Sequence, residues 1–493
     1  MTITGAFVRA AVLEQTARTR HSSKPDIQRF IEDSEQKITS LESQISTLVE
    51  LRDRERACVH ALRYIVSPIR TLPIELLVEI FRLAIGDETH VEDTYRITQV
   101  CSDWRKVAHA TPRLWTRPIR VELGDRTVYY RREGLYADGL EAWLARSVPI
   151  PVSVLVNLDR ATIDPRILEV LLSIAPRVQS LYCANFFPLP IISRLAGCRL
   201  DSLEELRVGM AGSLPTPPAF TMAPRLRKFS MTLHSNETQV LVPWAQLTDI
   251  DLDSESPDII LDILAQCTAL TRVSICTSGW PSSTPPQLTQ APLALNQLHT
   301  LSLDVGYPQH VTHFLDLLSG PALRTFHLNF SEMQTRIGQP ELESAALTSF
   351  LIRSPDITSL DIRCGPQGLA SHQLIATLEH TPCLTHLKLA YVGRNSFDDA
   401  LVDALSYKDG LGAAPLVPHL HDLVLENIDE NGFGKAALER MFLSRWWADG
   451  EIMSGPPAVP RWSYVGLWGK YSEQFMDSME TLQRKGLPLG LVN

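Results

Sequence analysis

Between residues 26 and 66, apolar residues return every three to four positions, which is the spacing of one face of an α-helix. No Gly or Pro interrupts the chain between Pro25 and Pro68, so the pattern predicts one long helix. Apolar side chains fill most of the two inward positions of a seven-residue repeat over about three heptads, as in a coiled coil. These two positions are Ile31, Ile38, Ile45, Arg52 and Val59, and Ser34, Leu41, Leu48, Glu55 and Leu62.

The long helix has two interpretations. Either it is a short coiled coil that makes the protein a homodimer through residues 27–62, or it is an amphipathic helix that folds back on the segment after it. Arg52 and Glu55 place charges in the seam, as we call the row formed by these two inward positions. The pattern alone therefore leaves both interpretations open. We assign residues 26–66 to this helix and expect residues 1–25 to form a disordered leader.

A second apolar pattern follows in residues 67–118 and predicts two short helices. Proline suits a first helical position because its φ is preset and the helix needs no N–H there, so the first helix is expected to begin at Pro73. A unit of roughly fifty residues cannot bury so many large apolar groups by itself. Part of the stripe must therefore face another surface, in this chain or in a partner. The apolar positions are Leu72, Leu76, Leu77, Ile80 and Phe81, then Val100, Cys101, Trp104 and Val107 on one face of the second helix, and finally Leu114 and Trp115.

This segment reads LPIELLVEIF, then VCSDWRKVA, and it ends on LW. It resembles an F-box, whose family pattern is LPxELLxxIF, VCxxWRxxA and a closing LW. The resemblance implies an adaptor that docks on a Skp-type linker protein and through it on a cullin of a ubiquitin ligase. Two amphipathic helices packed in an ordinary core are the alternative interpretation. The docking residues that the resemblance implies are Leu72, Pro73, Leu76, Leu77, Ile80, Phe81, Val100, Cys101 and Trp104.

The chain after residue 150 repeats one unit, in which an apolar residue is followed by two others, three and five positions later. In six of the ten units a proline stands two residues before the first apolar position, where it ends a preceding helix and favours an extended chain. The units are Val178-Leu181-Cys183, Leu203-Leu206-Val208, Leu226-Phe229-Met231, Leu247-Ile250-Leu252, Leu270-Val273-Ile275, Leu298-Leu301-Leu303, Leu323-Phe326-Leu328, Ile357-Leu360-Ile362, Leu384-Leu387-Leu389 and Leu420-Leu423-Leu425.

The units resemble a leucine-rich-repeat solenoid of the ribonuclease-inhibitor kind, with one strand and one helix per turn. The resemblance covers residues 151–445 and implies an irregular α/β horseshoe; another α/β topology is the alternative. Residues 119–150 are then expected to be a linker, and residues 446–493 to be a cap on the exposed end. The cap segment carries the aromatic residues Trp446, Trp447, Trp462, Tyr464 and Trp468.

Side chains alternate along a strand, so the residues between the apolar positions are expected to point out of the sheet. Asp249, Asp251 and Asp253 then stand in one row, and a basic partner segment would relieve the repulsion between these charges. A solvated sheet face whose charges serve solubility is the alternative. The target-binding residues predicted in this way are Tyr182, Arg207, Asp249, Asp251, Asp253, Asp304, His327, Asp361 and Lys388.

Composition narrows the class of protein further. The chain is 44% hydrophobic and 21% charged, as soluble folded proteins are, and its net charge of −10 disfavours nucleic-acid binding. No apolar run approaches the ~20 residues that span a bilayer. The eight cysteines lack the paired spacing of a disulfide scaffold or a zinc site. We expect a cytoplasmic or nuclear protein that binds neither nucleic acid nor membranes.

Motifs of catalysis are missing from the sequence. The run from Gly432 to Lys435 imitates part of a phosphate loop, but Asp429 and Ala436 stand where that loop requires glycine and Ser or Thr. A nucleophile elbow of the form G-x-S-x-G does not occur. The sequence predicts that the protein is not an enzyme and holds no catalytic group, cofactor or metal.

These observations predict an α/β protein with a long N-terminal helix, a small all-α F-box and an α/β solenoid. The expected function is that of a substrate-recognition adaptor of a Skp–cullin–F-box ubiquitin ligase, whose solenoid binds an unknown target. One alternative is a coiled-coil and solenoid scaffold that binds a stable partner without any ubiquitin-ligase role. Another is an enzyme on an α/β fold whose strands imitate repeats.

Overall fold

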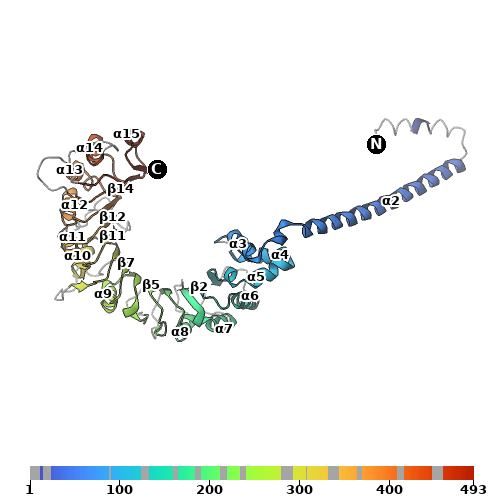
Figure 1. The fold of residues 1–493 in the computed structure, drawn as a ribbon, viewed down its shortest axis with the longest axis horizontal. Helices are drawn as coiled ribbons and strands as arrows, with labels where there is room; N and C mark the ends of the chain where they lie inside the picture. The colour runs from blue at the N-terminus through green and yellow to red at the C-terminus, as the bar shows by residue number, and fades with distance from the viewer. Residues whose placement is uncertain are drawn as a thin grey trace. The chain divides into compact units, whose positions relative to one another are not determined.

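The computed structural model of the chain (Figure 1) divides into two compact units, residues 1–108 and residues 109–493. In the part of the chain that the structure describes, no helix is both long enough and apolar enough to cross a bilayer. The described residues are 12–14, 24–87, 90–123, 133–158, 165–183, 190–210, 219–233, 240–278, 292–306, 308–330, 344–363, 369–407, 416–446 and 459–492. Most of the expected leader lies outside them.

The described part of unit 1 is helical. Pro73 precedes the second of its α-helices in an extended conformation (φ −54°, ψ 146°), so that helix begins one residue later than predicted. The helix predicted around Val100 and Trp104 is two helices, because the chain leaves the helical path at Cys101. The Cys101 thiol accepts a hydrogen bond from the Trp104 N–H (3.4 Å) where the next helix starts. The elements are α2 (Lys24–Ile65), η1 (Pro68–Thr71), α3 (Ile74–Ala84), α4 (His90–Val100) and α5 (Ser102–His109).

Helix α2 confirms the long helix predicted at residues 26–66. All of its described side chains are exposed except Ser34, which is half-buried. The seam residues Ile38, Leu41, Ile45 and Leu48 are each more than half exposed. An amphipathic helix folded back on the following segment would bury one apolar face, and α2 buries none among its described side chains.

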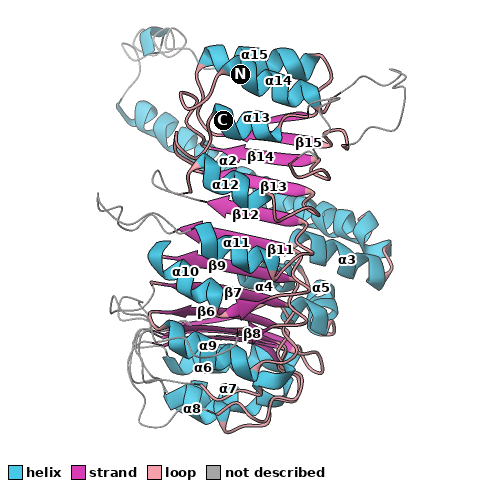
Figure 2. Cartoon of the chain, turned by 90° about the vertical axis from the view of Figure 1, so that its left-hand side faces the viewer, coloured by secondary structure: helices cyan, strands magenta, loops and turns pink. Residues whose placement is uncertain are grey.

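Unit 2 contains a parallel sheet whose strands follow one another in chain order. Figure 2 shows the strands of unit 2 as one stack with the helices of the same unit in a layer along one face; we call the other face of the sheet the open face. The strands are β1 (Ile119–Leu123), β2 (Val152–Leu158), β3 (Val178–Cys183), β4 (Glu205–Met210), β5 (Lys228–Leu233), β6 (Asp249–Ser254), β7 (Arg272–Thr277), β9 (Thr300–Val305), β11 (Thr325–Phe330), β12 (Ser359–Arg363), β13 (His386–Ala390), β14 (Asp422–Glu426), β15 (Tyr464–Trp468) and β16 (Leu489–Val492).

The helices of unit 2 connect successive strands. Residues 175–177, where a proline precedes a repeat unit, form a short 3-10 helix. The short strands β8 (Leu293–Ala294) and β10 (Leu318–Ser319) pair separately. The helices are η2 (Pro112–Trp115), α6 (Glu133–Arg146), α7 (Pro165–Ser173), η4 (Ala175–Arg177), α8 (Pro190–Ala196), η5 (Trp244–Gln246), α9 (Pro257–Gln266), α10 (Pro308–Asp316), α11 (Ser344–Ile352), α12 (Ser371–Leu378), α13 (Asp399–Leu405), α14 (Lys435–Ser444) and α15 (Glu473–Arg484).

Each of the ten repeat units coincides with a strand, and the strand register stacks their apolar positions. The middle apolar residue of one unit lies beside that of the next, for example Leu181 beside Leu206 and Phe326 beside Leu360. These residues are buried against the helices. The register therefore builds one continuous apolar core, in which every strand covers the exposed edge of the strand before it.

The sheet begins before residue 151 and ends after residue 445, which are the limits that the sequence predicted for the repeats. The expected linker at residues 119–150 contains β1 and α6, and Ile119 and Val121 of β1 are buried beside β2. The expected cap at residues 446–493 adds the last two strands of the same sheet, β15 and β16. The cap contains one more copy of the repeat unit, Trp462-Val465-Leu467 with Pro460 two residues before it, which the prediction omitted. β1 and β16 lack the complete unit, because Thr116 and Gly486 stand at its first position.

Candidate functional site

Helix α3 in unit 1 presents apolar side chains to both the interior and the solvent. Leu77 and Phe81 are 7% and 1% exposed, and the Phe81 ring packs against that of Trp104 at a centroid distance of 4.8 Å. The neighbouring face carries Leu76, Ile80 and Leu83, which are 53%, 41% and 81% exposed. These three lie at i, i+4 and i+7 and so form one row along the helix.

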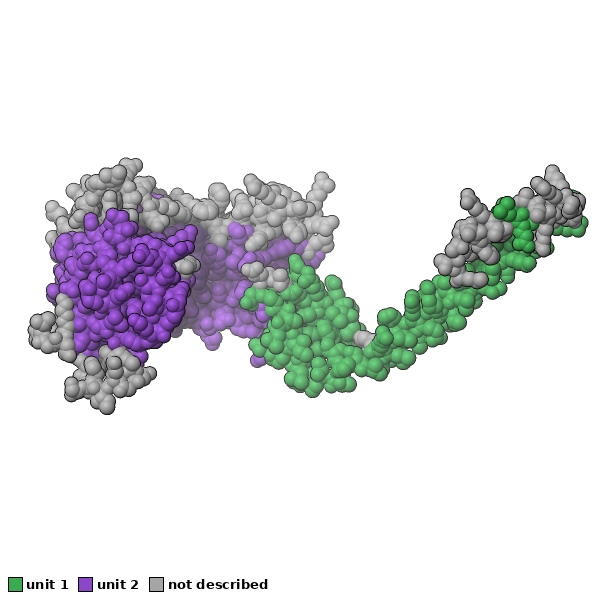
Figure 3. Space-filling view, turned by 90° about the horizontal axis from the view of Figure 1, so that it is seen from above, with its two compact units in different colours: residues 1–108 green, residues 109–493 purple. Residues whose placement is uncertain are grey.

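Other apolar side chains of α3 and α4 are also exposed. Ile74 begins α3 and Val100 ends α4, and both are more than half exposed; Val91 and Tyr95 of α4 are also exposed. We call the set Ile74, Leu76, Ile80, Leu83 and Val100 the apolar patch of unit 1, the unit drawn in green in Figure 3. Clustered apolar groups at a surface are typical of a protein-binding site.

The residues predicted to dock on an adaptor divide between this patch and the interior. Leu76, Ile80 and Val100 are exposed, as is Pro73, whereas Leu72, Cys101 and Trp104 are half-buried. Leu77 and Phe81 are buried, so their contacts are with the rest of the unit. The predicted docking residues did not include Ile74 or Leu83, although Leu83 lies three residues after Ile80 and seven after Leu76, so its place in the row was readable from the same pattern.

Against this geometry we compared the chain with known protein families. The F-box-like family model matches residues 69–120. The match therefore contains the whole of α3, α4 and α5, together with the apolar patch. Among curated proteins, no similar sequence was found.

The end of the F-box-like segment belongs to unit 2. Leu114 and Trp115 of η2 are buried, and the Trp115 ring meets that of Trp143 on α6 edge-on at a centroid distance of 4.8 Å. The Arg146 guanidinium lies over the Trp115 ring, 4.8 Å from its centroid. The closing Leu-Trp pair of the F-box pattern thus serves as the first layer of the core beneath the sheet.

The predicted target-binding residues all lie on the open face of unit 2. Each alternates with the buried residues of its strand, and none of them is buried. Tyr182 and Arg207 are register partners on β3 and β4. They line a pocket of about 330 Å³ that also includes Leu155, and Arg207 forms an ion pair with Glu205 (2.7 Å).

The middle of the open face is acidic, as predicted. Asp249 forms an ion pair with Arg272 on β7 (2.9 Å), and Asp251 accepts a hydrogen bond from Ser230 (3.1 Å). Asp253, Cys276 and Asp304 are consecutive in the strand register. Burial, followed by the carboxylates of Asp253 and Asp304, raises the pKa of the Cys276 thiol to about 12. At neutral pH this thiol is protonated and is a poor nucleophile.

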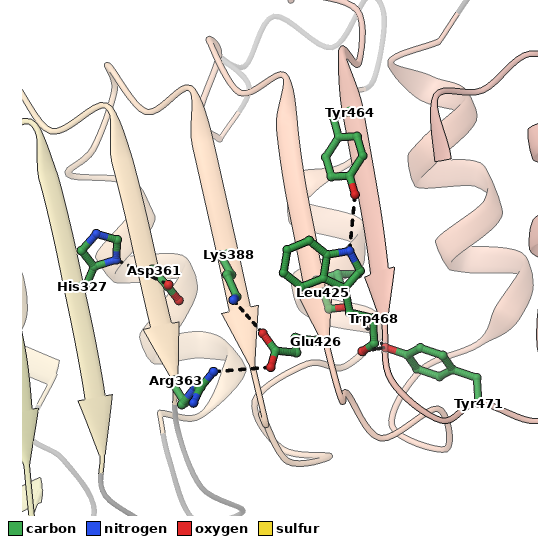
Figure 4. A network of polar contacts seen from close by, with 9 residues as sticks. All are labelled: His327, Asp361, Arg363, Lys388, Leu425, Glu426, Tyr464, Trp468 and Tyr471. Carbon is green, nitrogen blue, oxygen red and sulfur yellow. Dashed lines mark hydrogen bonds and ion pairs between the residues drawn. The ribbon is translucent and has the colours of Figure 1, made fainter. Parts of the chain in front are cut away.

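Towards the C-terminus the open face carries paired charges (Figure 4). Glu426 accepts from Lys388 (2.7 Å) and from Arg363 (3.4 Å), and His327 pairs with Asp361 (3.4 Å). Asp361 thus lies apart from the acidic middle and has its own partner. His327, Asp361 and Lys388 were among the predicted target-binding residues, whereas Glu426, which pairs with residues of two other strands, was not.

An aromatic pair from β15 borders these charges. The Lys388 ammonium lies 4.9 Å from the centroid of the Trp468 ring, and the Trp468 N–H donates to the Tyr464 hydroxyl (3.3 Å). The Tyr471 hydroxyl donates to the carbonyls of Leu425 (3.4 Å) and Trp468 (3.3 Å). Burial raises the pKa of Tyr471 to about 12.

The aromatic residues expected in the cap therefore separate into two groups. Tyr464 and Trp468 lie on the open face, whereas Trp462 is buried and donates its ring N–H to the Phe442 carbonyl (3.0 Å). Trp447 lies outside the described residues. Arg445 is fully buried near Trp462, and it donates to the carbonyls of Val417 (3.2 Å) and Leu420 (3.1 Å). Burial lowers the pKa of its guanidinium to about 10.

Proposed function

We propose that this protein is a substrate-recognition adaptor of a Skp–cullin–F-box ubiquitin ligase. The carrying observation is the exposed row Leu76, Ile80 and Leu83 inside the segment that the F-box-like family model matches. Through the apolar patch the F-box would dock on a Skp-type linker protein. Docking would bury side chains that now contact water, and this burial drives association.

The second part of the proposal is that unit 2 is a leucine-rich-repeat solenoid whose open face binds the target. Parallel strands in chain order, with a helix between many successive pairs, support this assignment. An adaptor of this kind catalyses no bond chemistry. It raises the effective concentration of a target lysine near a ubiquitin-loaded enzyme. The cytoplasm and the nucleus are the compartments in which we place this activity.

A purified Skp-type linker protein provides the direct test. The full-length chain should capture it, and the Leu76→Asp, Ile80→Asp variant should not, because each carboxylate would have to be desolvated at the interface. The matched control is Ile352→Asp, Leu443→Asp, which places the same two changes at apolar residues of unit 2 that are 57% and 42% exposed. Failure of the folded wild-type chain to bind, or equal binding by all three chains, would refute the proposal.

We further propose that α2 joins two copies of the chain as a coiled coil. The exposed seam of α2 supports this, because a helix in water gains most of its stability from packing an apolar face. In a parallel dimer Lys37 and Glu42 occupy the flanking positions that pair between helices, which adds an attractive contact on each side.

Sedimentation of the full-length chain tests the dimer. Leu41→Gln, Leu48→Gln should produce monomers, whereas Ser43→Gln, Thr47→Gln changes exposed side chains at outward positions of the repeat and should leave the dimer intact. A monomeric wild-type chain would contradict the coiled coil. A dimer that fails to bind the Skp-type linker would favour the alternative, a scaffold without a ubiquitin-ligase role.

A further inference from the structure

Three side chains with metal-binding atoms converge where β13 and β14 begin, at the margin of the open face. His386 Nε2 lies 2.7 Å from Asp422 Oδ2, and His421 Nδ1 lies 3.4 Å from Asp422 Oδ1. One ligand atom from each residue fits within 4.8 Å of the others, and this is the one such His, Cys, Asp or Glu cluster among the described residues. The two imidazole rings meet edge-on at a centroid distance of 5.2 Å.

The hydrogen bonds around His386 leave one ring nitrogen turned towards the carboxylate. The Thr385 hydroxyl donates to the Thr358 carbonyl (2.9 Å), and it lies 2.8 Å from His386 Nδ1. When this hydroxyl donates its one proton to the Thr358 carbonyl, its oxygen accepts from His386 Nδ1–H. In neutral His386 the Nε2 lone pair then faces an oxygen of Asp422. Two electron-rich atoms at this distance require a positive charge between them, supplied by a proton or by a metal ion.

Asp422 supplies a second, independent observation. Its Oδ1 atom is buried, and no donor among the described residues forms a hydrogen bond with it. A buried polar atom without a partner costs free energy and calls for an explanation such as a bound ion. His421 Nδ1 lies 3.4 Å from this oxygen and 2.7 Å from the Ser463 hydroxyl. The Thr385 contact with His386 Nδ1 is of the kind that orients a metal-binding imidazole, because it holds the ring nitrogen that does not face Asp422.

We propose that His386, His421 and Asp422 bind a divalent transition-metal ion of the zinc type. Two imidazoles and one carboxylate are a common set of protein ligands for zinc, and they leave a fourth position for water or for another side chain. Bond lengths of about 2.0–2.2 Å in a tetrahedron place the ligand atoms roughly 3.3 Å apart. The three ligand atoms now lie within 4.8 Å of one another, and the His386 side chain, 53% exposed, has room to move towards this separation.

The site is independent of the proposed adaptor function, and Zn²⁺ itself is the probe. All chains in the test carry Cys58→Ser and Cys383→Ser, because these exposed thiols could bind zinc. Calorimetric titration of the full-length chain should give one tight equivalent of Zn²⁺. His386→Ala and Asp422→Asn should each weaken it at least tenfold. The matched control is His327→Ala, which removes a histidine of the same face that pairs with a single aspartate.

Thermal unfolding supplies a readout of folded-state binding. Zn²⁺ should raise the melting temperature of the parent chain and of the His327→Ala control, and it should leave the melting temperature of the two site variants unchanged. Circular dichroism establishes that each variant is folded before titration. Absence of a tight equivalent in the parent chain would overturn the proposal. Equal affinity in the site variants and the control would do so as well, since the ion would then bind elsewhere.

Discussion

Two adjacent leucines of α3, Leu76 and Leu77, should differ strongly in how much stability the protein loses when each is replaced by alanine. Leu77 is 7% exposed and belongs to the core of unit 1, whereas Leu76 is 53% exposed and belongs to the apolar patch. Leu77→Ala leaves a cavity and should lower the free energy of unfolding of unit 1 by about 2–5 kcal/mol. Leu76→Ala removes atoms that are already half in water and should change that free energy by less than about 1 kcal/mol.

The effect of the patch on binding follows from the exposed fractions. Full burial of a leucine or isoleucine side chain contributes about 1.5–3 kcal/mol. Leu76 and Ile80 still have 53% and 41% of their surface to bury. Complete burial at an interface would therefore contribute about 0.8–1.6 and 0.6–1.2 kcal/mol, together about 1.4–2.8 kcal/mol. The Leu76→Ala, Ile80→Ala variant should raise the Kd for a Skp-type linker by roughly 10- to 100-fold.

Two measurements separate the effects on folding and on binding. Biolayer interferometry with an immobilised Skp-type linker gives the Kd, and hydrogen exchange of the α3 and α5 amides gives the local free energy of opening. Leu76→Ala, Ile80→Ala should weaken binding and leave exchange unchanged, whereas Leu77→Ala should accelerate exchange. If Leu76→Ala destabilised α3 as much as Leu77→Ala did, the division of α3 into an inner and an outer face would be wrong.

Three further predictions concern unit 2. Arg445→Ala should lower the free energy of unfolding by about 3 kcal/mol or more in urea titrations, since it leaves a cavity, removes the guanidinium donor to the Leu420 carbonyl and removes one of two donors to the Val417 carbonyl; an unchanged midpoint would contradict this. Tyr471 has its pKa raised to about 12 in the folded chain, so the unfolded chain ionises first and stability should fall as the pH rises from 10 to 12; the fall should be smaller in Tyr471→Phe, and identical slopes would refute the assignment. A pKa of about 12 leaves Cys276 roughly a thousandfold less thiolate than a thiol with a pKa of 9, so a chain without its exposed cysteines should react slowly with a disulfide reagent, and Asp253→Asn should accelerate that reaction.

The long helix, the two-part apolar segment and ten of the strands were readable from the sequence. Each depends on local spacing: an uninterrupted helical period for α2, and a strand unit with a preceding proline for the core strands of unit 2. The outward positions of Asp249, Asp251 and Asp253 followed from the same alternation, because neighbouring side chains on a strand must face opposite sides. Patterns of this kind can be recognised in a sequence without any knowledge of tertiary contacts.

Strand pairing and tertiary packing determined the features of the fold that local spacing could not predict. β1 and β16 carry weaker patterns, and they are strands because they lie beside an already formed strand edge whose N–H and C=O groups need partners. The assignment of Leu76 to solvent and Leu77 to the interior depends on where the Trp104 ring packs. The break at Cys101 depends on a thiol that accepts a backbone N–H of the next helix.

The amino-acid sequence by itself determined which side of each core strand is apolar and which segment resembles an F-box. Only the tertiary structure brought together residues that are far apart in the chain. His386 and Asp422 meet because β13 and β14 are neighbours in register, and Glu426 reaches both Lys388 and Arg363 for the same reason. Which residues become neighbours in a parallel sheet depends on how strands pair after connections of different length. The spacing of residues along the sequence does not show this pairing.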